Sequence, residues 1–253
     1  MKRLRPLFLS VLATLLLVGA AAAENSPWAG RTVVVTGANR GLGLEFAKQL
    51  KEAGADVIGT ARKPDEADEL KALGVRVEQL DVADDASVAA FAARLDGAAV
   101  DVLLNNAGIF PTREGFEGST VDESRRIYEV NTLGPMRVTQ ALLPNLRAGD
   151  RKLVMNMSSG LGSIANAGRG AMLGYRMSKA ALNMQTRVQA GDLAAEGFIF
   201  VAMSPGWVRT DMGGPNANLE PAESIRGMLA TMAPLTAADS GKYFAYSGEE
   251  LPW

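Results

Sequence analysis

Two periodicities of apolar and polar positions alternate along most of the chain. Short apolar runs are typical of buried parallel strands, and apolar residues three and four apart predict amphipathic helices. Predicted strands lie near Thr32–Val35, Asp56–Gly59, Arg76–Gln79, Val100–Leu104, Lys152–Asn156, Ile199–Met203 and Tyr243–Tyr246. Predicted helices lie near Leu42–Ala53, Pro64–Leu73, Asp85–Leu95, Asp122–Ala148, Arg176–Glu196 and Ala222–Thr231. The alternation predicts right-handed βαβ units: a single-domain, doubly wound α/β fold with a parallel sheet of about seven strands and helices on both faces.

Residues 1–23 have a different pattern. Three basic residues precede an uncharged, mostly apolar run, which ends in Gly19 and four alanines up to Ala23. This order is typical of a secretory signal peptide cleaved after Ala23, which leaves residues 24–253 as the mature domain. An uncleaved membrane anchor is the alternative, because the uncharged stretch just reaches spanning length. We therefore expect an exported protein, periplasmic or secreted, that contacts a membrane only if the leader is kept; a cytoplasmic protein would require a misassigned start.

The amino-acid composition excludes several kinds of catalytic and metal site. The chain has 253 residues, 47% of them hydrophobic, which is enough for a core without metals or disulfides. Its formal charge of -2 gives no electrostatic reason to expect nucleic-acid binding. It contains neither Cys nor His, which excludes thiol nucleophiles, His-based triads and Cys/His metal sites. We expect no metal site, and any acid–base step near neutral pH must use a Tyr, Lys, Asp or Glu with a shifted pKa.

A glycine-rich turn follows the first predicted strand, with the sequence Thr36-Gly37-Ala38-Asn39-Arg40-Gly41-Leu42-Gly43. Glycines allow close approach of the backbone to a pyrophosphate, and the following helix offers its free N–H groups. An ordinary strand-to-helix turn is the alternative, but the place of this turn in the first βαβ unit favours nucleotide binding.

Tyr175 and Lys179 supply the acid–base pair that the missing histidines demand. They are four residues apart on a predicted helix, and this spacing puts them on one face. A free tyrosine titrates near pH 10, and a neighbouring ammonium group favours the phenolate, so we expect a lowered pKa. The same spacing also occurs by chance on many amphipathic helices.

The Gly-x-x-x-Gly-x-Gly spacing of the turn resembles that of the short-chain dehydrogenase/reductase family, a group of Rossmann-type NAD(P)-dependent enzymes, and matching segments continue to the C-terminus. The resemblance implies that Gly37, Gly41 and Gly43 hold the diphosphate and that Asn39, Arg40 and Leu42 line the loop. Further matching segments imply cofactor contacts by Asp81, Val82, Asn105, Ala107, Gly108, Pro205, Gly206, Val208 and Thr210.

The resemblance also implies a catalytic tetrad. Ser159, the second serine of Met157-Ser158-Ser159-Gly160, and Tyr175 would bind a carbonyl oxygen while NADPH delivers hydride to the carbon. Tyr175 would supply the proton, and Lys179 would hold the nicotinamide ribose. Lys179 and the positive nicotinamide of the oxidised complex would both lower the pKa of Tyr175. Asn131 would hold a water behind the lysine. We assign Ser158 a structural hydrogen bond.

Cofactor preference is predicted from the end of the second strand. NAD-preferring members usually have an acidic residue there, whereas this strand ends in Ala61-Arg62-Lys63. A guanidinium pairs well with phosphate, so Arg62, together with Arg40, indicates NADP(H) over NAD(H). Solvated surface cations are the alternative reading of both arginines.

Two departures from the common family pattern point to a subgroup. Extra residues between Ser159 and Tyr175, in Asn166 to Leu173, and the ending Gly241 to Trp253 resemble small carbonyl reductases such as the sniffer and C-factor proteins. The implied reaction interconverts a small ketone or aldehyde and its alcohol. A catalytically silent nucleotide-binding sensor or scaffold is the alternative. The long predicted helices form the dimer surface in many relatives, so a homodimer is possible here.

Overall fold

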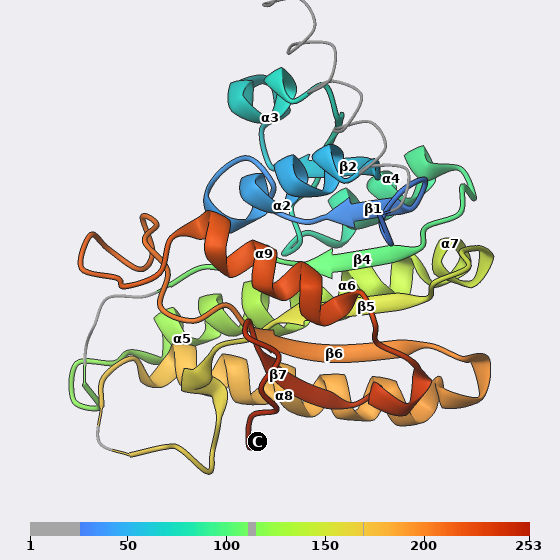
Figure 1. Ribbon diagram of the computed structural model, residues 1–253. Helices are drawn as coiled ribbons and strands as arrows, with labels where there is room; N and C mark the ends of the chain where they lie inside the picture. Colours follow the sequence, from blue (N-terminus) through green and yellow to red (C-terminus); the bar gives the residue numbers. More distant parts are fainter. Residues whose placement is uncertain (1–25, 111–114, 169) are drawn as a thin grey trace, which may run out of the picture.

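A computed structural model describes residues 26–110, 115–168 and 170–253 (Figure 1). Its seven strands form one parallel sheet in the order β3-β2-β1-β4-β5-β6-β7. The strands are β1 Thr32–Val35, β2 Asp56–Ala61, β3 Arg76–Gln79, β4 Val102–Asn105, β5 Leu153–Met157, β6 Ile199–Ser204 and β7 Lys242–Ala245. The order reverses between β1 and β4, and in such sheets ligands bind at this point, beyond the carboxyl ends of the strands. The predicted fold class is confirmed.

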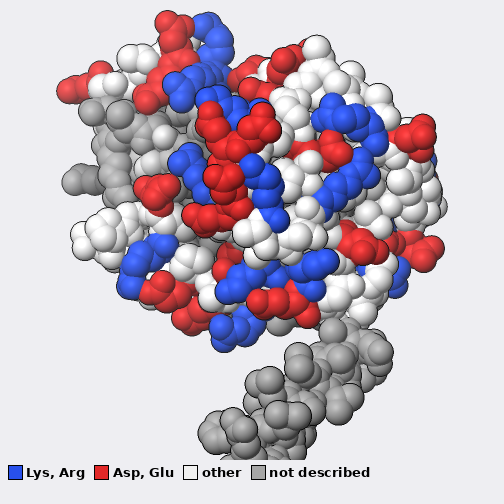
Figure 2. Space-filling model, turned by 90° about the horizontal axis from the view of Figure 1, so that it is seen from above, with Lys and Arg blue, Asp and Glu red and all other residues white. Residues whose placement is uncertain are grey.

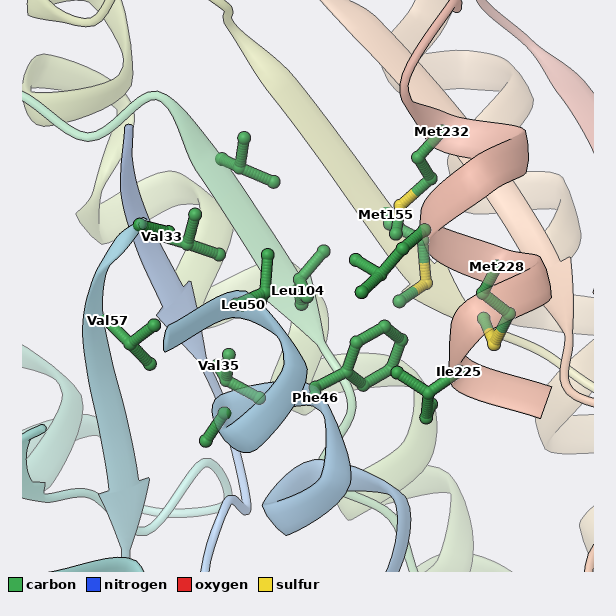
Figure 3. Packing of buried hydrophobic residues seen from close by; sticks show 14 of the residues in the cluster. Val33, Val35, Phe46, Leu50, Val57, Leu104, Met155, Ile225, Met228 and Met232 are labelled. Atoms are coloured by element: carbon green, nitrogen blue, oxygen red, sulfur yellow. The ribbon is translucent and has the colours of Figure 1, made fainter. Parts of the chain in front are cut away.

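Helices cover both faces of the sheet (Figure 1). They are α2 Gly41–Glu52, α3 Asp68–Ala72, α4 Asp85–Leu95, α5 Val121–Tyr128, α6 Gly134–Ala141, α7 Leu143–Ala148, α8 Leu173–Asp192 and α9 Pro221–Met232. Alternate strand residues point to opposite faces. Val33 and Val35 pack with α2 and α9 on one face, as Figure 3 shows, and Val34 packs with α4, α6 and α7 on the other. All three valines are fully buried, as in a sheet covered on both sides.

The prediction of one long helix over Asp122–Ala148 is wrong. The structure has α5, one turn of π-helix at Glu129–Leu133, α6 and α7 in succession. Pro135 and Pro144 explain the breaks, because a proline has no N–H to donate and its ring clashes with the preceding turn. The apolar periodicity continues across both prolines, and for this reason the pattern alone predicted a single helix.

Two further boundaries differ from the prediction. The stretch Pro64–Leu73 divides into a 3₁₀ turn at Pro64–Glu66 and the short helix α3. Helix α8 begins at Leu173 and not at Arg176, so Tyr175 lies inside its first turn.

The chain folds back along β7 after that strand ends. Ala245 N donates to Glu249 O at 2.8 Å, and Leu251 N donates to Tyr243 O at 2.7 Å. Phe244 and Glu250 form an antiparallel bridge. The outer edge of β7 is therefore hydrogen-bonded to the residues that follow it.

The surface carries both signs of charge. On the face in Figure 2, basic and acidic side chains are interspersed, with no broad patch of one sign. No helix within the described residues is long and apolar enough to span a bilayer. The predicted leader, residues 1–23, lies outside the described residues.

Candidate active site

The glycine turn joins β1 to the start of α2. Gly37 and Gly41 have φ values of 64° and 56°, in the left-handed region that favours glycine. A Cβ on Gly43 would lie 2.2 Å from Gly37 O, so no other residue fits there without a backbone shift. Among the described residues, no side chain caps α2 at its extended N-cap, Arg40. The free N–H groups and exposed turn, with Asn39 exposed and Leu42 partly buried, suit a bound phosphate.

Two residues that sequence reasoning did not select hold this turn against the end of β4. Thr36 Oγ1 accepts hydrogen bonds from Asn106 N and Ala107 N, both at 3.0 Å. The Asn106 side chain donates to Thr36 O at 2.8 Å and to Gly37 O at 3.1 Å. A Cβ on Gly37 would lie 3.0 Å from Ala107 Cα. The turn and the segment after β4 therefore form one rigid unit. The sequence signal for Asn106 was its place between Asn105 and Ala107, which the family resemblance had selected.

Asn105 lies behind the site. Its Nδ2 donates to Asn156 Oδ1 at 2.9 Å and to Thr139 Oγ1 at 3.0 Å, which joins β4 to β5 and α6. Its Oδ1 is buried without a hydrogen-bond partner among the described residues. The Asn105 side chain is thus committed to the core, and any cofactor contact at this position would have to come from the backbone.

The residues predicted at the adenine end also have local contacts. Asp81 Oδ1 accepts from Ala83 N at 3.0 Å, and Asp81 N donates to Ser87 Oγ at 2.8 Å, so Asp81 shapes the turn before α4. Val82 is buried, and a Cβ on Gly134 would lie 2.9 Å from its side chain.

Both predicted phosphate-pairing arginines are exposed. Arg62 follows β2 directly. The Arg40 side chain is 73% exposed and pairs with Asp211, which is 86% exposed, at a distance of 3.4 Å. Asp211 belongs to the segment after β6, so this ion pair joins that segment to the glycine turn.

Asn131 is fully buried in the π-helical turn and clamps the chain after Gly108. Its Oδ1 accepts from Ile109 N at 2.8 Å, and its Nδ2 donates to Ile109 O at 2.9 Å and to Ser178 Oγ at 3.3 Å. A Cβ on Gly108 would lie 3.3 Å from Asn131 Oδ1 and 3.8 Å from Lys179 Nζ. Gly108 is therefore adjacent to two members of the predicted tetrad.

Lys179 is buried on the inner face of α8. Its Nζ donates to Met157 O at 2.7 Å and lies 5.6 Å from the centre of the Tyr175 ring. Burial lowers the pKa of Lys179 from 10.5 to about 7, because the charged ammonium is removed from water.

Tyr175 is also buried, and its ring packs edge-on against Phe110 with centroids 4.9 Å apart. Burial raises the pKa of Tyr175 to about 12, although a hydrogen bond with the Ser159 side chain opposes the shift. The lowered pKa expected from the sequence is therefore reversed. Desolvation by burial is the largest cause of the raised pKa of Tyr175, and burial also lowers the pKa of the neighbouring Lys179.

The two serines after β5 lie in different surroundings. Ser159 caps the 3₁₀ turn Gly160–Gly162, and its Oγ accepts from Leu161 N at 3.2 Å. Ser158 is 1% exposed and donates to Asn183 Oδ1 at 2.6 Å. Only the Ser159 side chain reaches Tyr175, and the structure thus brings Asn131, Ser159, Tyr175 and Lys179 together.

The segment after β6 lies next to the glycine turn. Pro205 O accepts from Ser224 Oγ at 2.7 Å, and Gly206 has a φ of 81°. Val208 is buried and bridges to Leu219, and a Cβ on Gly41 would lie 3.8 Å from Thr210 Cγ2. The predicted diphosphate and nicotinamide segments therefore lie next to each other at Gly41 and Thr210.

The glycine turn lies at the switch point of a parallel sheet, before a helix without a side-chain cap. Near it lies a cluster of the buried Asn131, Tyr175 and Lys179 with the partly buried Ser159. Together these features define a Rossmann-type oxidoreductase. The family model described as short chain dehydrogenase matches residues 31–220. The chain belongs to the short-chain dehydrogenase family.

Known relatives agree with the predicted subgroup. C-signal of Myxococcus xanthus is 45% identical over 164 residues, which cover 65% of this chain and 99% of that protein. NADPH-bound carbonyl reductase from chicken fatty liver superposes with a TM-score of 0.83 at 36% identity, over 89% of this chain and 100% of that one. Carbonyl reductase Sniffer of D. melanogaster gives a TM-score of 0.84 at 30% identity, with the same coverage.

Proposed function

We propose that this oxidoreductase reduces a small ketone or aldehyde to its alcohol with NADPH. The observation that carries the proposal is the buried Tyr175 phenol, hydrogen-bonded to Ser159 and stacked above the Lys179 ammonium at the carboxyl edge of the sheet. The NADPH-bound chicken carbonyl reductase supports the choice of cofactor. So do the exposed Arg40 and Arg62, because each can pair with a 2′-phosphate.

When NADPH is bound, its nicotinamide would supply the hydride to the carbonyl carbon. Ser159 Oγ and Tyr175 Oη hydrogen-bond the carbonyl oxygen and stabilise the negative charge that develops there. Tyr175 then transfers its phenolic proton to that oxygen, which completes the alcohol. The edge-on Phe110 ring excludes water from one side of the phenol.

Tyr175 is in the form that can donate a proton. Burial raises its pKa to about 12, so the phenol is protonated at neutral pH. Lys179 keeps Met157 O as one acceptor and has further N–H groups for ribose hydroxyls.

Replacement of Tyr175 tests the proposal. Tyr175→Phe removes the proton donor and keeps the buried ring, so kcat for carbonyl reduction should fall by about 10²–10⁴-fold while NADPH affinity stays unchanged. Tyr128→Phe is the matched control, because its phenol lies 40% exposed on α5. Near-normal turnover by a folded Tyr175→Phe protein would overturn the mechanism. A wild-type chain that binds NADPH but reduces no aldehyde or ketone would favour the sensor alternative.

We also propose that the domain is exported and that its chain starts near Glu24. The order of charge, apolar run and small residues in the first 23 positions supports this proposal. Cell fractionation with N-terminal sequencing tests it. A protein recovered from the cytoplasm with Met1 intact would contradict export and leave the enzymatic proposal standing.

A homodimer through the long helices is the assembly that we propose. Met177, Met184 and Val188 recur at helical spacing on α8 and are 47%, 65% and 52% exposed. Tyr128 on α5 and Met136 on α6 add further exposed apolar surface. In solution, sedimentation should give a dimer for the native chain and a monomer for Met184→Glu/Val188→Glu. A monomeric native chain would rule out this assembly.

A further inference from the structure

Tyr243 is a buried tyrosine that contacts the catalytic serine from the far end of the chain. It lies on β7 and is 0% exposed, and its hydroxyl donates to Ser159 O at 2.5 Å. Its register partner on β6 is Ala202, which pairs in turn with Asn156 on β5. In the sequence, Tyr243 stands out only as part of the ending Gly241 to Trp253, which gave it no role of its own.

The hydrogen bond holds one particular peptide group. Ser159 O accepts from Tyr243 and also from Gly162 N at 2.7 Å. The N–H of the same peptide, on Gly160, donates to Ser204 Oγ at 3.0 Å. Both polar ends of the Ser159–Gly160 peptide are therefore fixed. The orientation of this peptide sets the backbone of Ser159 and thus the direction in which its Oγ points.

The residues after β7 hold Tyr243 in turn. The Trp253 ring stacks on the Tyr243 ring with centroids 5.3 Å apart and planes 25° from parallel. The backbone oxygen of Trp253 accepts from Ala165 N at 2.8 Å and from Ser163 Oγ at 3.2 Å. The same short tail therefore fixes Ser159 through Tyr243, and fixes Ser163 and Ala165 directly.

We propose that Tyr243 is a positioning residue for Ser159, and that Trp253 positions both Tyr243 and the chain from Ser159 to Ala165 along the substrate side of the site. This inference rests on the proposed carbonyl reduction. Tyr243 is fully buried, and it acts through the direction of the Ser159 hydroxyl. The carbonyl oxygen is the group whose binding depends on that direction.

The test deletes the hydroxyl alone. Tyr243→Phe keeps the ring and its stack on Trp253, and should lower kcat for carbonyl reduction by about 10-fold, the scale of one hydrogen bond, with NADPH affinity unchanged. Tyr246→Phe is the matched control, because the Tyr246 hydroxyl has no hydrogen-bond partner among the described residues. A folded Tyr243→Phe protein with wild-type kcat would overturn the inference.

A double-mutant cycle separates positioning from general stability. If Tyr243 acts through Ser159, adding Tyr243→Phe to Ser159→Ala should cause no further loss of kcat. An equal 10-fold loss in both backgrounds would show that the hydroxyl acts independently of Ser159. If Tyr175→Phe remains active, the proposed function itself fails. If only Tyr175→Phe is inactive, the function stands and this inference fails.

Trp253 has its own prediction within the proposal. Trp253→Phe retains a ring to stack on Tyr243, whereas Trp253→Ala removes it and should raise KM for the carbonyl substrate and lower kcat, each several-fold. Recovery of both constants by Trp253→Phe is the expected result. Equal damage by both variants, or none by either, would contradict a stacking role.

Discussion

Replacing Lys179 by methionine should stabilise the fold while it stops catalysis. Lys179 is 4% exposed, and its ammonium group donates a hydrogen bond to Met157 O. Burial lowers its pKa from 10.5 to about 7, so the folded protein holds the charged form at a cost. Methionine has a similar length and no charge to desolvate.

The size and sign of the effect follow from proton linkage. Between pH 7 and 10.5 the unfolded chain binds more protons at this lysine than the folded chain, so its contribution to stability rises with pH. At about 1.4 kcal/mol for each pH unit, the full penalty, present below about pH 7, is roughly 5 kcal/mol. Loss of the bond to Met157 O costs the variant about 1–3 kcal/mol. Lys179→Met should therefore be about 2–4 kcal/mol more stable near pH 6 and less stable than wild type near pH 10.

Urea unfolding without nucleotide, measured from about pH 6 to about pH 10, checks this prediction. The difference in unfolding free energy between wild type and variant isolates the lysine from the other titrating groups. Lys48→Met is the control, since Lys48 is exposed on α2 and its loss should give a small, flat difference. A difference for Lys179→Met that does not change sign or slope with pH would refute the reasoning.

Three further predictions concern the nucleotide site. Arg62→Asp should move preference towards NADH, and an unchanged ratio of kcat/KM for NADPH and NADH would count against it. Asp211→Asn frees Arg40 from its 3.4 Å ion pair and should tighten NADPH binding about 2–5-fold, which is the scale of an exposed ion pair. NADH binding should be unaffected. A fluorescence titration that shows equal changes in affinity for both cofactors would contradict this prediction. Gly43→Ala should lower unfolding free energy and NADPH affinity, because its Cβ would lie 2.2 Å from Gly37 O. Gly191→Ala, which meets open space on α8, is its control, and wild-type stability and affinity in Gly43→Ala would disprove the clash.

The sequence predicted those features of the fold that depend on local patterns of residues. Buried strands such as Val33–Val35 are recognisable because a strand covered on both faces needs a continuous apolar run. The helix from Asp122 was not resolved into its parts, because apolar periodicity says nothing of the missing N–H at Pro135. The shifted pKa of Tyr175 was predicted with the wrong sign, because burial depends on the whole fold whereas the lysine spacing is local.

The candidate site likewise contains residues that the sequence predicted and residues that it did not. The glycine turn and the Tyr175–Lys179 pair are short segments whose spacing survives in the folded chain. Tyr243 and Asp211 were missed because their partners, Ser159 and Arg40, are distant in the sequence and meet only through the order of strands in the sheet. No spacing rule along the chain would have found those contacts.

The tail folded along β7 also limits how copies of this protein can join. An open strand edge is a template on which another chain can add a strand. Here residues Glu249 and Leu251 already use the outward backbone groups of β7. A sheet continuous between two copies at this edge would require those residues to detach, and their detachment would strain the stack of Trp253 on Tyr243. The same few residues thus protect this edge against aggregation and order the backbone around Ser159. A change that weakens the protection should therefore also weaken the order around Ser159.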